Sequence, residues 1–132
     1  MKKVLFASSE CVPFIKTGGL ADVVGSLPKC FDKRYYDVRV ILPKYSCMKQ
    51  QWKDMMDFAG QSQYVGVLEC VYDGITFYFI DNEHYFTGDK PYTEHHWDIE
   101  KFMYFDRAVL SALPLLDFRP DVIHCHDWQT GL

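Results

Sequence analysis

The stretch Glu10-Cys-Val-Pro-Phe-Ile-Lys-Thr-Gly-Gly-Leu20 joins a short apolar run to an amphipathic one. The run before it, Val4–Ser8, is continuous and apolar, which is typical of a strand buried on both faces of a parallel sheet. The residues after it show the i, i+3, i+4, i+7 apolar spacing of a helix that lies on such a sheet. These apolar residues are Leu20, Val23, Val24 and Leu27. The stretch is therefore predicted to be a strand-to-helix loop of an α/β domain.

The end of this loop is suited to an anion. Thr17 is predicted to cap the helix through its hydroxyl, and Gly18 and Gly19 have no Cβ to keep a ligand from their backbone N–H groups. A helix N-terminus carries unpaired donors and partial positive charge, and Lys16 adds a full charge beside it. The pattern favours a phosphate or diphosphate, although a plain tight turn with a solvated lysine would have the same local sequence.

This loop matches neither GxGxxG nor GxxxxGK(S/T), so the sequence gives no support to a nicotinamide cofactor or an ATPase mechanism. The chain of 132 residues has the size of one domain, and its 48% hydrophobic and 17% aromatic content indicates a packed core. A net charge of -4 excludes the basic footprint of a nucleic-acid-binding protein. We see neither a signal peptide nor a membrane-spanning run and expect a cytoplasmic protein.

The five cysteines are scattered and contain no CxxC pair, so they indicate neither a disulfide framework nor a zinc ribbon. We expect reduced thiols that are mostly buried, with Cys11 in the loop as the possible exception. The cysteines are Cys11, Cys30, Cys47, Cys70 and Cys125.

Downstream of the loop, the first helix is predicted from about Gly18 to Phe31, with a kink or early end at Pro28. The second strand is Val38–Leu42, so the first forty residues form a βαβ unit. The stretch Lys44–Gly60 is ambiguous because its apolar period is poor.

Two β-rich runs, Tyr64–Tyr72 and Ile75–Ile80, flank Asp73-Gly74, which is a strong hairpin signal. Such a hairpin is either an antiparallel addition to the sheet or a flap at its edge. A long polar and aromatic connection, Asn82–Trp97, follows, with exposed loop histidines at His95 and His96.

Asp98 is predicted to cap the next helix, whose apolar residues form a core stripe. A short buried strand, Asp121–Cys125, then leads into the loop His126–Leu132, where the chain stops just as a helix should begin. We expect a fragment, incomplete at its C-terminal end, whose uncovered edge promotes self-association. The stripe comprises Phe102, Phe105, Val109, Ala112, Leu113 and Leu116.

The second loop has the residue types of a polyol site: the imidazole of His126, the carboxylate of Asp127, the aromatic face of Trp128 and the amide of Gln129. His124 alternates onto the same side of the strand as His126 and is expected to be a hydrogen-bonded core histidine. The i, i+2 histidine spacing is weak evidence for a metal. In a parallel sheet both loops follow carboxyl ends of strands, so they can face one cleft.

Two long motifs carry a family resemblance. Residues 3–29, which contain the first loop, resemble the N-terminus of bacterial glycogen synthases and plant starch synthases, and Pro120–Leu132 resembles that family's second N-terminal signature. The likeness covers the whole chain and includes Val40-Ile-Leu-Pro-Lys-Tyr45. At Tyr92-Thr-Glu-His-His-Trp-Asp98 the chain departs from the Tyr-Gly and acidic run that the family tends to have.

The resemblance implies that residues 1–132 form an incomplete Rossmann-like half of a two-domain GT-B glycosyltransferase. The family activity is retaining transfer of glucose from ADP-glucose to the non-reducing end of an α-1,4-glucan, with no metal or cofactor. A second, nucleotide-binding domain would be the partner that this chain lacks, so the chain alone is expected to be inactive.

The matched motifs also imply roles for single residues. In the first motif, Lys16, Gly18 and Gly19 would meet the diphosphate, Asp22 would support that loop, and Glu10 would contact the acceptor. In the second, His126 and Asp127 would act at the catalytic centre, and Gln129 would line the donor-sugar and acceptor side. All of these residues lie in the two loops that the residue chemistry singles out.

Two other functions fit less of the sequence. One is a non-catalytic module that binds glucan or a protein partner, and the other is a different GT-B transferase with another sugar nucleotide. The sequence of such a different GT-B transferase would be expected to differ from this chain at Lys16-Thr-Gly-Gly-Leu20.

Overall fold

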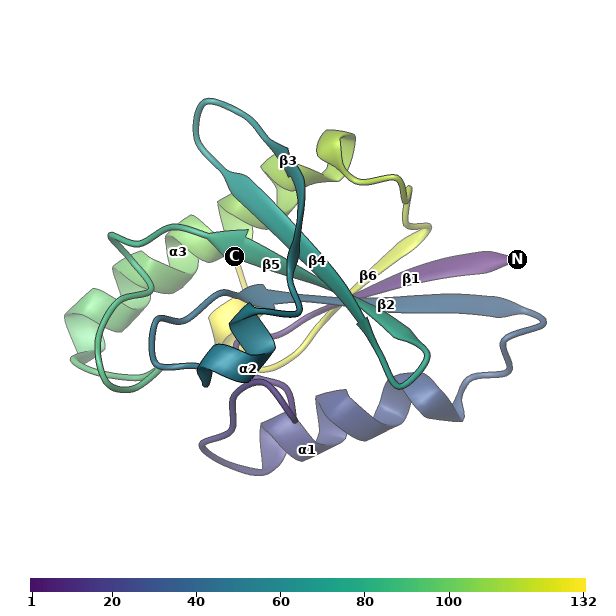
Figure 1. Cartoon of the computed structure of the whole chain (residues 1–132), viewed down its shortest axis with the longest axis horizontal. Helices are drawn as coiled ribbons and strands as arrows, with labels where there is room; N and C mark the ends of the chain where they lie inside the picture. The colour runs from purple at the N-terminus through teal and green to yellow at the C-terminus, as the bar shows by residue number, and fades with distance from the viewer.

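The first apolar run forms a central strand of a six-stranded sheet (Figure 1). The computed structural model describes all 132 residues, and in it β1 (Lys2–Ala7) pairs in parallel with β2 (Tyr36–Pro43) on one side and β6 (Val122–Cys125) on the other. The sheet order is β3-β4-β5-β2-β1-β6. The other elements are β3 (Asp57–Gln61), β4 (Gly66–Tyr72), β5 (Ile75–Asp81), α1 (Gly19–Ser26), α2 (Gln50–Lys53) and α3 (His95–Ala112), with 3₁₀ turns at Leu27–Cys30, Leu113–Leu115 and Trp128–Thr130.

The predicted hairpin is confirmed and is an antiparallel addition to the sheet. β5 lies parallel to β2, and β4 returns antiparallel to β5. Asp73 and Gly74 at the turn have φ values of 51° and 78°, the left-handed pair that lets a two-residue turn match the strand twist. The ambiguous stretch supplies α2 and the edge strand β3.

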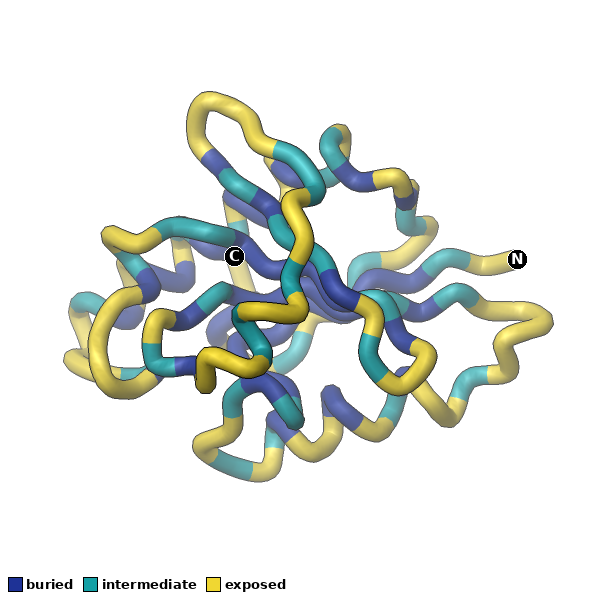
Figure 2. The backbone as a smooth tube through the Cα atoms, viewed as in Figure 1, coloured by how far each residue is buried: buried dark blue, intermediate teal, exposed yellow.

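The two longer helices lie on opposite faces of the sheet. Phe6 of β1 packs edge-to-face on Phe31, which follows α1, at 6.0 Å, whereas its neighbour Ala7 lines a cavity with Val109 of α3. Successive side chains of a strand point to opposite faces, so α1 covers one face and α3 the other (Figure 1). The central strands between them are buried (Figure 2), as the apolar runs predict.

The first helix is shorter than expected and rests on a different stripe. Regular α-helix stops at Ser26, and Pro28 lies in the following 3₁₀ turn, which confirms the early end. Val23 was expected in the buried stripe but is 51% exposed, because the helix turns Ala21, Val24 and Gly25 inward.

Two other predictions need correction. Asp98 does not cap α3: the helix begins at His95 with Glu94 as its N-cap, so His95 and His96 are exposed helix residues. β6 is not a buried strand, since β1 is its only partner and Val122 is 47% exposed. No helix is both long and apolar enough to span a membrane.

Gly25 is the position where α1 most tightly constrains the sequence. A Cβ there would lie 2.3 Å from Val12 Cγ2 and 3.0 Å from the Val12 carbonyl oxygen. We expect Gly25→Ala to lower the free energy of unfolding by about 1–3 kcal/mol, since the Val12 side chain must shift to relieve the clash and the Val12 carbonyl beside it leaves little room. Urea titration followed by circular dichroism measures this. Gly19→Ala is the matched control, because a Cβ at Gly19 meets nothing within 4 Å; equal losses in both variants would contradict the packing argument.

Candidate functional site

Both loops singled out in the sequence leave the same edge of the sheet. Ala7 at the end of β1 pairs with Cys125 at the end of β6. Directly beyond this pair, the His126 N–H donates to the Ala7 carbonyl at 3.1 Å. The structure thus confirms that the two loops start side by side at the carboxyl ends of parallel strands, where ligands of such sheets bind.

A buried carboxylate organises the first loop. Glu10 is only 2% exposed, and its Oε2 accepts hydrogen bonds from the Thr17 backbone N–H at 2.8 Å and the Thr17 hydroxyl at 2.6 Å. The prediction that Thr17 caps α1 is therefore wrong: Gly18 is the N-cap, without a side-chain bond. Thr17 lies one residue before this N-cap, and its hydroxyl donates a charge-assisted hydrogen bond to the Glu10 carboxylate.

The predicted anion-binding residues surround the start of α1. Lys16 Nζ lies 2.7 Å from Asp22 Oδ2, and both side chains are 53% exposed. Asp22 thus forms an ion pair with the lysine, and its support of the loop stays a prediction. A Cβ on Gly19 would point into open space, so its backbone is accessible from that side. The N-terminus of α1 thus presents Lys16 and unobstructed backbone together.

His124 of β6 and His126, the first residue of the second loop, point to the same side, as predicted. Their ring centroids are 4.4 Å apart, and each packs on Phe6, at 4.9 Å for His124 and 4.8 Å for His126. His124 is exposed and has no side-chain hydrogen bond, so its assignment as a core histidine is wrong. The edge position of β6 leaves that ring uncovered.

His126 is the more constrained of the two. Its Nε2 is buried without a hydrogen-bond partner. Burial lowers its pKa, and the neighbouring His124 lowers it further, so the neutral imidazole is favoured. A neutral ring can either donate to or accept from a sugar hydroxyl.

The residues after His126 are divided between surface and interior. Asp127 is exposed at φ 65°, and its carboxylate accepts from the Trp128 N–H at 2.8 Å. Trp128 is 52% exposed and offers an aromatic face. Gln129 is 6% exposed, and its Oε1 lacks a partner. No three His, Cys, Asp or Glu side chains are grouped to hold a metal.

The cysteines are free, as expected, but only Cys11 and Cys70 are buried. Cys11 is not a reactive exception. Burial raises the pKa of its thiol to about 12, and the charge of Lys29 only partly opposes the rise. This thiol belongs to the packing of the loop.

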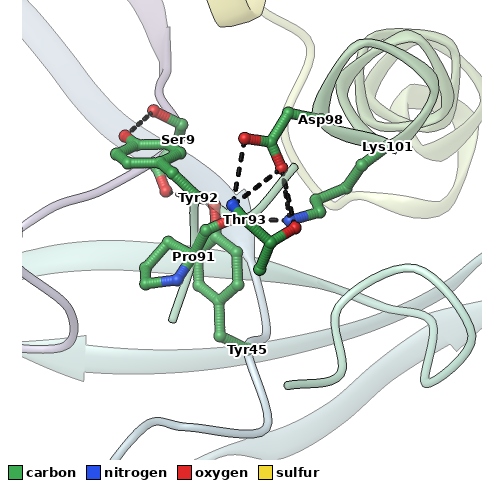
Figure 3. Close-up of polar contacts among 7 residues, drawn as sticks. All are labelled: Ser9, Tyr45, Pro91, Tyr92, Thr93, Asp98 and Lys101. Atoms are coloured by element: carbon green, nitrogen blue, oxygen red, sulfur yellow. Dashed lines mark hydrogen bonds and ion pairs between the residues drawn. The ribbon is translucent and has the colours of Figure 1, made fainter. Parts of the chain in front are cut away.

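Sequence reasoning missed a group of residues that joins a third segment to the first loop. The Tyr92 hydroxyl lies 2.6 Å from Ser9 Oγ, and the Tyr45 hydroxyl donates to the Ser9 carbonyl at 2.6 Å (Figure 3). Behind Tyr92, Asp98 and Lys101 form an ion pair with exposures of 9% and 1%. The available signal was a lysine on the buried face of α3, one residue before Phe102.

Known proteins share this arrangement. The family model described as "starch synthase catalytic domain" matches residues 3–132. The chain belongs to this family. Glycogen synthases of Lachnospira eligens and Lachnoclostridium phytofermentans are 61% and 60% identical to this chain over its full length. The chain spans 29% of the length of each of these two relatives.

A solved structure agrees with this assignment. The catalytic domain of starch synthase IV from Arabidopsis thaliana, bound to ADP and acarbose, matches with a TM-score of 0.78 and 34% identity. The match covers 98% of this chain and 28% of that chain. The resemblance stated for the two end motifs is confirmed. The chain has the fold of part of a GT-B starch synthase catalytic domain.

Glu10 provides a test of the first loop of this starch synthase-family chain. Glu10→Gln removes the charge from the two bonds to Thr17, so we expect the Thr17 amide to exchange with solvent faster and the unfolding free energy to fall by about 1–3 kcal/mol. Hydrogen exchange by NMR and urea titration measure the two effects. Asp22→Asn breaks only an exposed ion pair and should cost at most about 1 kcal/mol. An unchanged Thr17 exchange rate in Glu10→Gln would contradict the role of the carboxylate.

Thiol labelling tests the assignment of Cys11. At about pH 8 the Cys11 thiol is expected to stay protonated and unreactive toward a disulfide reagent in the folded chain, because the thiolate is the nucleophile. The exposed Cys30 and Cys125 should label first, and mass spectrometry of peptides identifies the sites. Labelling of Cys11 should begin only in denaturant; rapid labelling of Cys11 in the folded chain would refute its burial.

Proposed function

We propose that this chain forms part of a retaining glucosyltransferase that moves glucose from ADP-glucose to the non-reducing end of an α-1,4-glucan. One observation carries the proposal: the loop with the residue chemistry of an anion site and the loop with that of a polyol site start side by side, after β1 and β6. Family membership and the ADP and acarbose bound to the Arabidopsis protein support it.

The first loop would meet the donor's diphosphate. Lys16 supplies a full positive charge, and the backbone at Gly18 and Gly19 begins a helix with unpaired N–H donors. When ADP leaves, negative charge develops on the diphosphate, and these groups would stabilise it. Asp22 holds the lysine in place until an anion arrives.

The second loop would meet the sugars. His126 and Asp127 would act on hydroxyl groups at the reacting end, and Gln129 would line the wall beside them. Trp128 presents an exposed ring on which an apolar sugar face can pack. Glu10 is too buried to be more than a supporting contact for an acceptor, because its carboxylate is committed to Thr17. Transfer would need no metal or cofactor, and the protein would act in the cytoplasm.

A radiolabel assay in the protein that carries this chain tests the proposal. Transfer of labelled glucose from ADP-glucose to glycogen is expected, insensitive to EDTA. Lys16→Met should lower kcat/KM by roughly 10²-fold, because it removes the charge that faces the leaving group.

The same assay distinguishes the alternatives. Lys33→Met is the matched control, since Lys33 is exposed in the turn before β2, at the opposite end of the parallel strands from both loops, and should leave transfer unchanged. Transfer from UDP-glucose but not from ADP-glucose would support another sugar-nucleotide enzyme. Glucan binding without any transfer would support a non-catalytic module, and either result would overturn the proposal.

A further inference from the structure

The segment that contains Tyr92 is held from behind by a buried ion pair. Lys101 Nζ donates to the Pro91 carbonyl at 2.6 Å and lies 3.1 Å from Asp98 Oδ1. Asp98 in turn accepts from the Thr93 N–H at 3.0 Å. Each member of the pair therefore grips one of the two residues that flank Tyr92 (Figure 3).

The front of the same segment reaches the first loop. The Tyr92 hydroxyl and Ser9 Oγ are 2.6 Å apart, and Ser9 directly precedes Glu10, which holds Thr17. Burial raises the pKa of Tyr92 to about 12; the carboxylates of Glu10 and Asp127 add to this rise, while its hydrogen bonds oppose it. The Tyr92 ring also packs on Phe102, with ring centroids 5.9 Å apart, and Phe102 packs edge-to-face on Trp128 of the second loop at 5.9 Å, so Tyr92 lies beside both loops of the candidate site.

We propose that Asp98 and Lys101 are positioning residues that hold the Tyr92 hydroxyl at the boundary between the two loops. A buried ion pair is not needed for stability alone, because apolar residues of similar volume often serve as well. Here the pair has a second task, since both partners also bond to the backbone of the segment on either side of Tyr92. The effect of this ion pair on catalysis rests on the proposed function, whereas its placement of the Tyr92 hydroxyl does not.

The geometric part is tested without any substrate. Lys101→Met alone would leave Asp98 as an unpaired buried charge and can prevent folding. The double variant Asp98→Asn/Lys101→Met removes both charges and the bond to Pro91, so it is the variant to use. Asp32→Asn/Arg34→Met is the matched control, because it removes an ion pair that is exposed and remote in sequence from Tyr92.

The readout is the Tyr92 ring, labelled with 13C at Cζ and followed by NMR. In the unmodified chain and the control, Tyr92 should remain protonated up to about pH 11, whereas in the double variant it should titrate near the ordinary value of about 10. Circular dichroism confirms that each variant is folded, and if the double variant is unfolded, Asp98→Asn/Lys101→Gln, which also leaves no unpaired buried charge, replaces it as the test. An unchanged Tyr92 titration in a folded variant would overturn the proposal.

The catalytic part is tested by a double-mutant cycle in the transfer assay. If the pair acts through Tyr92, the double variant should lower kcat/KM roughly tenfold, and adding Tyr92→Phe should lower it no further. Independent, multiplying losses would overturn the positioning role. Absence of transfer in the unmodified protein would refute the proposed function, and the NMR titration would still decide the geometry.

Discussion

The parallel pairing of β1 with two neighbours at once is the constraint on which the rest of this structure depends. Its register with β6 sets Ala7 opposite Cys125, so the loops that follow must start together. Its register with β2 sets the same residue opposite Ile41 and fixes the sheet behind them. Because β1 is central, its apolar residues are fully enclosed, and a polar residue there would lose its hydration without gaining a partner. The location of the candidate site follows from a core-packing requirement.

Within that frame, one buried carboxylate gives the first loop its shape. Glu10 follows immediately after the strand and two buried serines, where no side chain reaches water. An ionised group in such a place needs hydrogen-bond donors, and the loop supplies them from Thr17, seven residues later. The chain between them must therefore close on itself, which brings Lys16 to the start of α1. The conformation of the first loop is a consequence of satisfying Glu10.

The parts of the fold that could be predicted are those in which a local pattern has one physical solution. The apolar run Val4–Ser8 is short enough to favour a buried strand over a helix, and Asp73-Gly74 fits a two-residue hairpin turn. The two predictions of helix caps failed because they depend on where each helix begins and on partners outside it. Thr17 has the chemistry of a cap, but it lies one residue before Gly18, the N-cap of α1, and its hydroxyl donates to Glu10. Asp98 also has the chemistry of a cap, but it is committed to Lys101 and Thr93.

The histidine pair shows a different limit. Alternation along β6 correctly placed His124 and His126 on one face, because side-chain direction in a strand follows from position alone. Exposure does not follow from position, since it depends on what lies beyond the strand. His124 is uncovered because β6 is an edge strand, whereas His126 is half-buried and packs on Phe6 and on the His124 ring. The sequence could therefore assign their direction but not their surroundings.

The state of Lys16 links this architecture to the proposed chemistry. Its ion pair with Asp22 is half exposed, and such pairs contribute at most about 1 kcal/mol. A diphosphate carries more charge than one carboxylate and also accepts from the N–H groups at the start of α1, so it competes favourably for the lysine. Asp22 thus keeps the side chain near the helix end at little cost to binding. An exposed pair serves this purpose, whereas a buried one such as Asp98–Lys101 would hold its lysine too firmly to exchange partners.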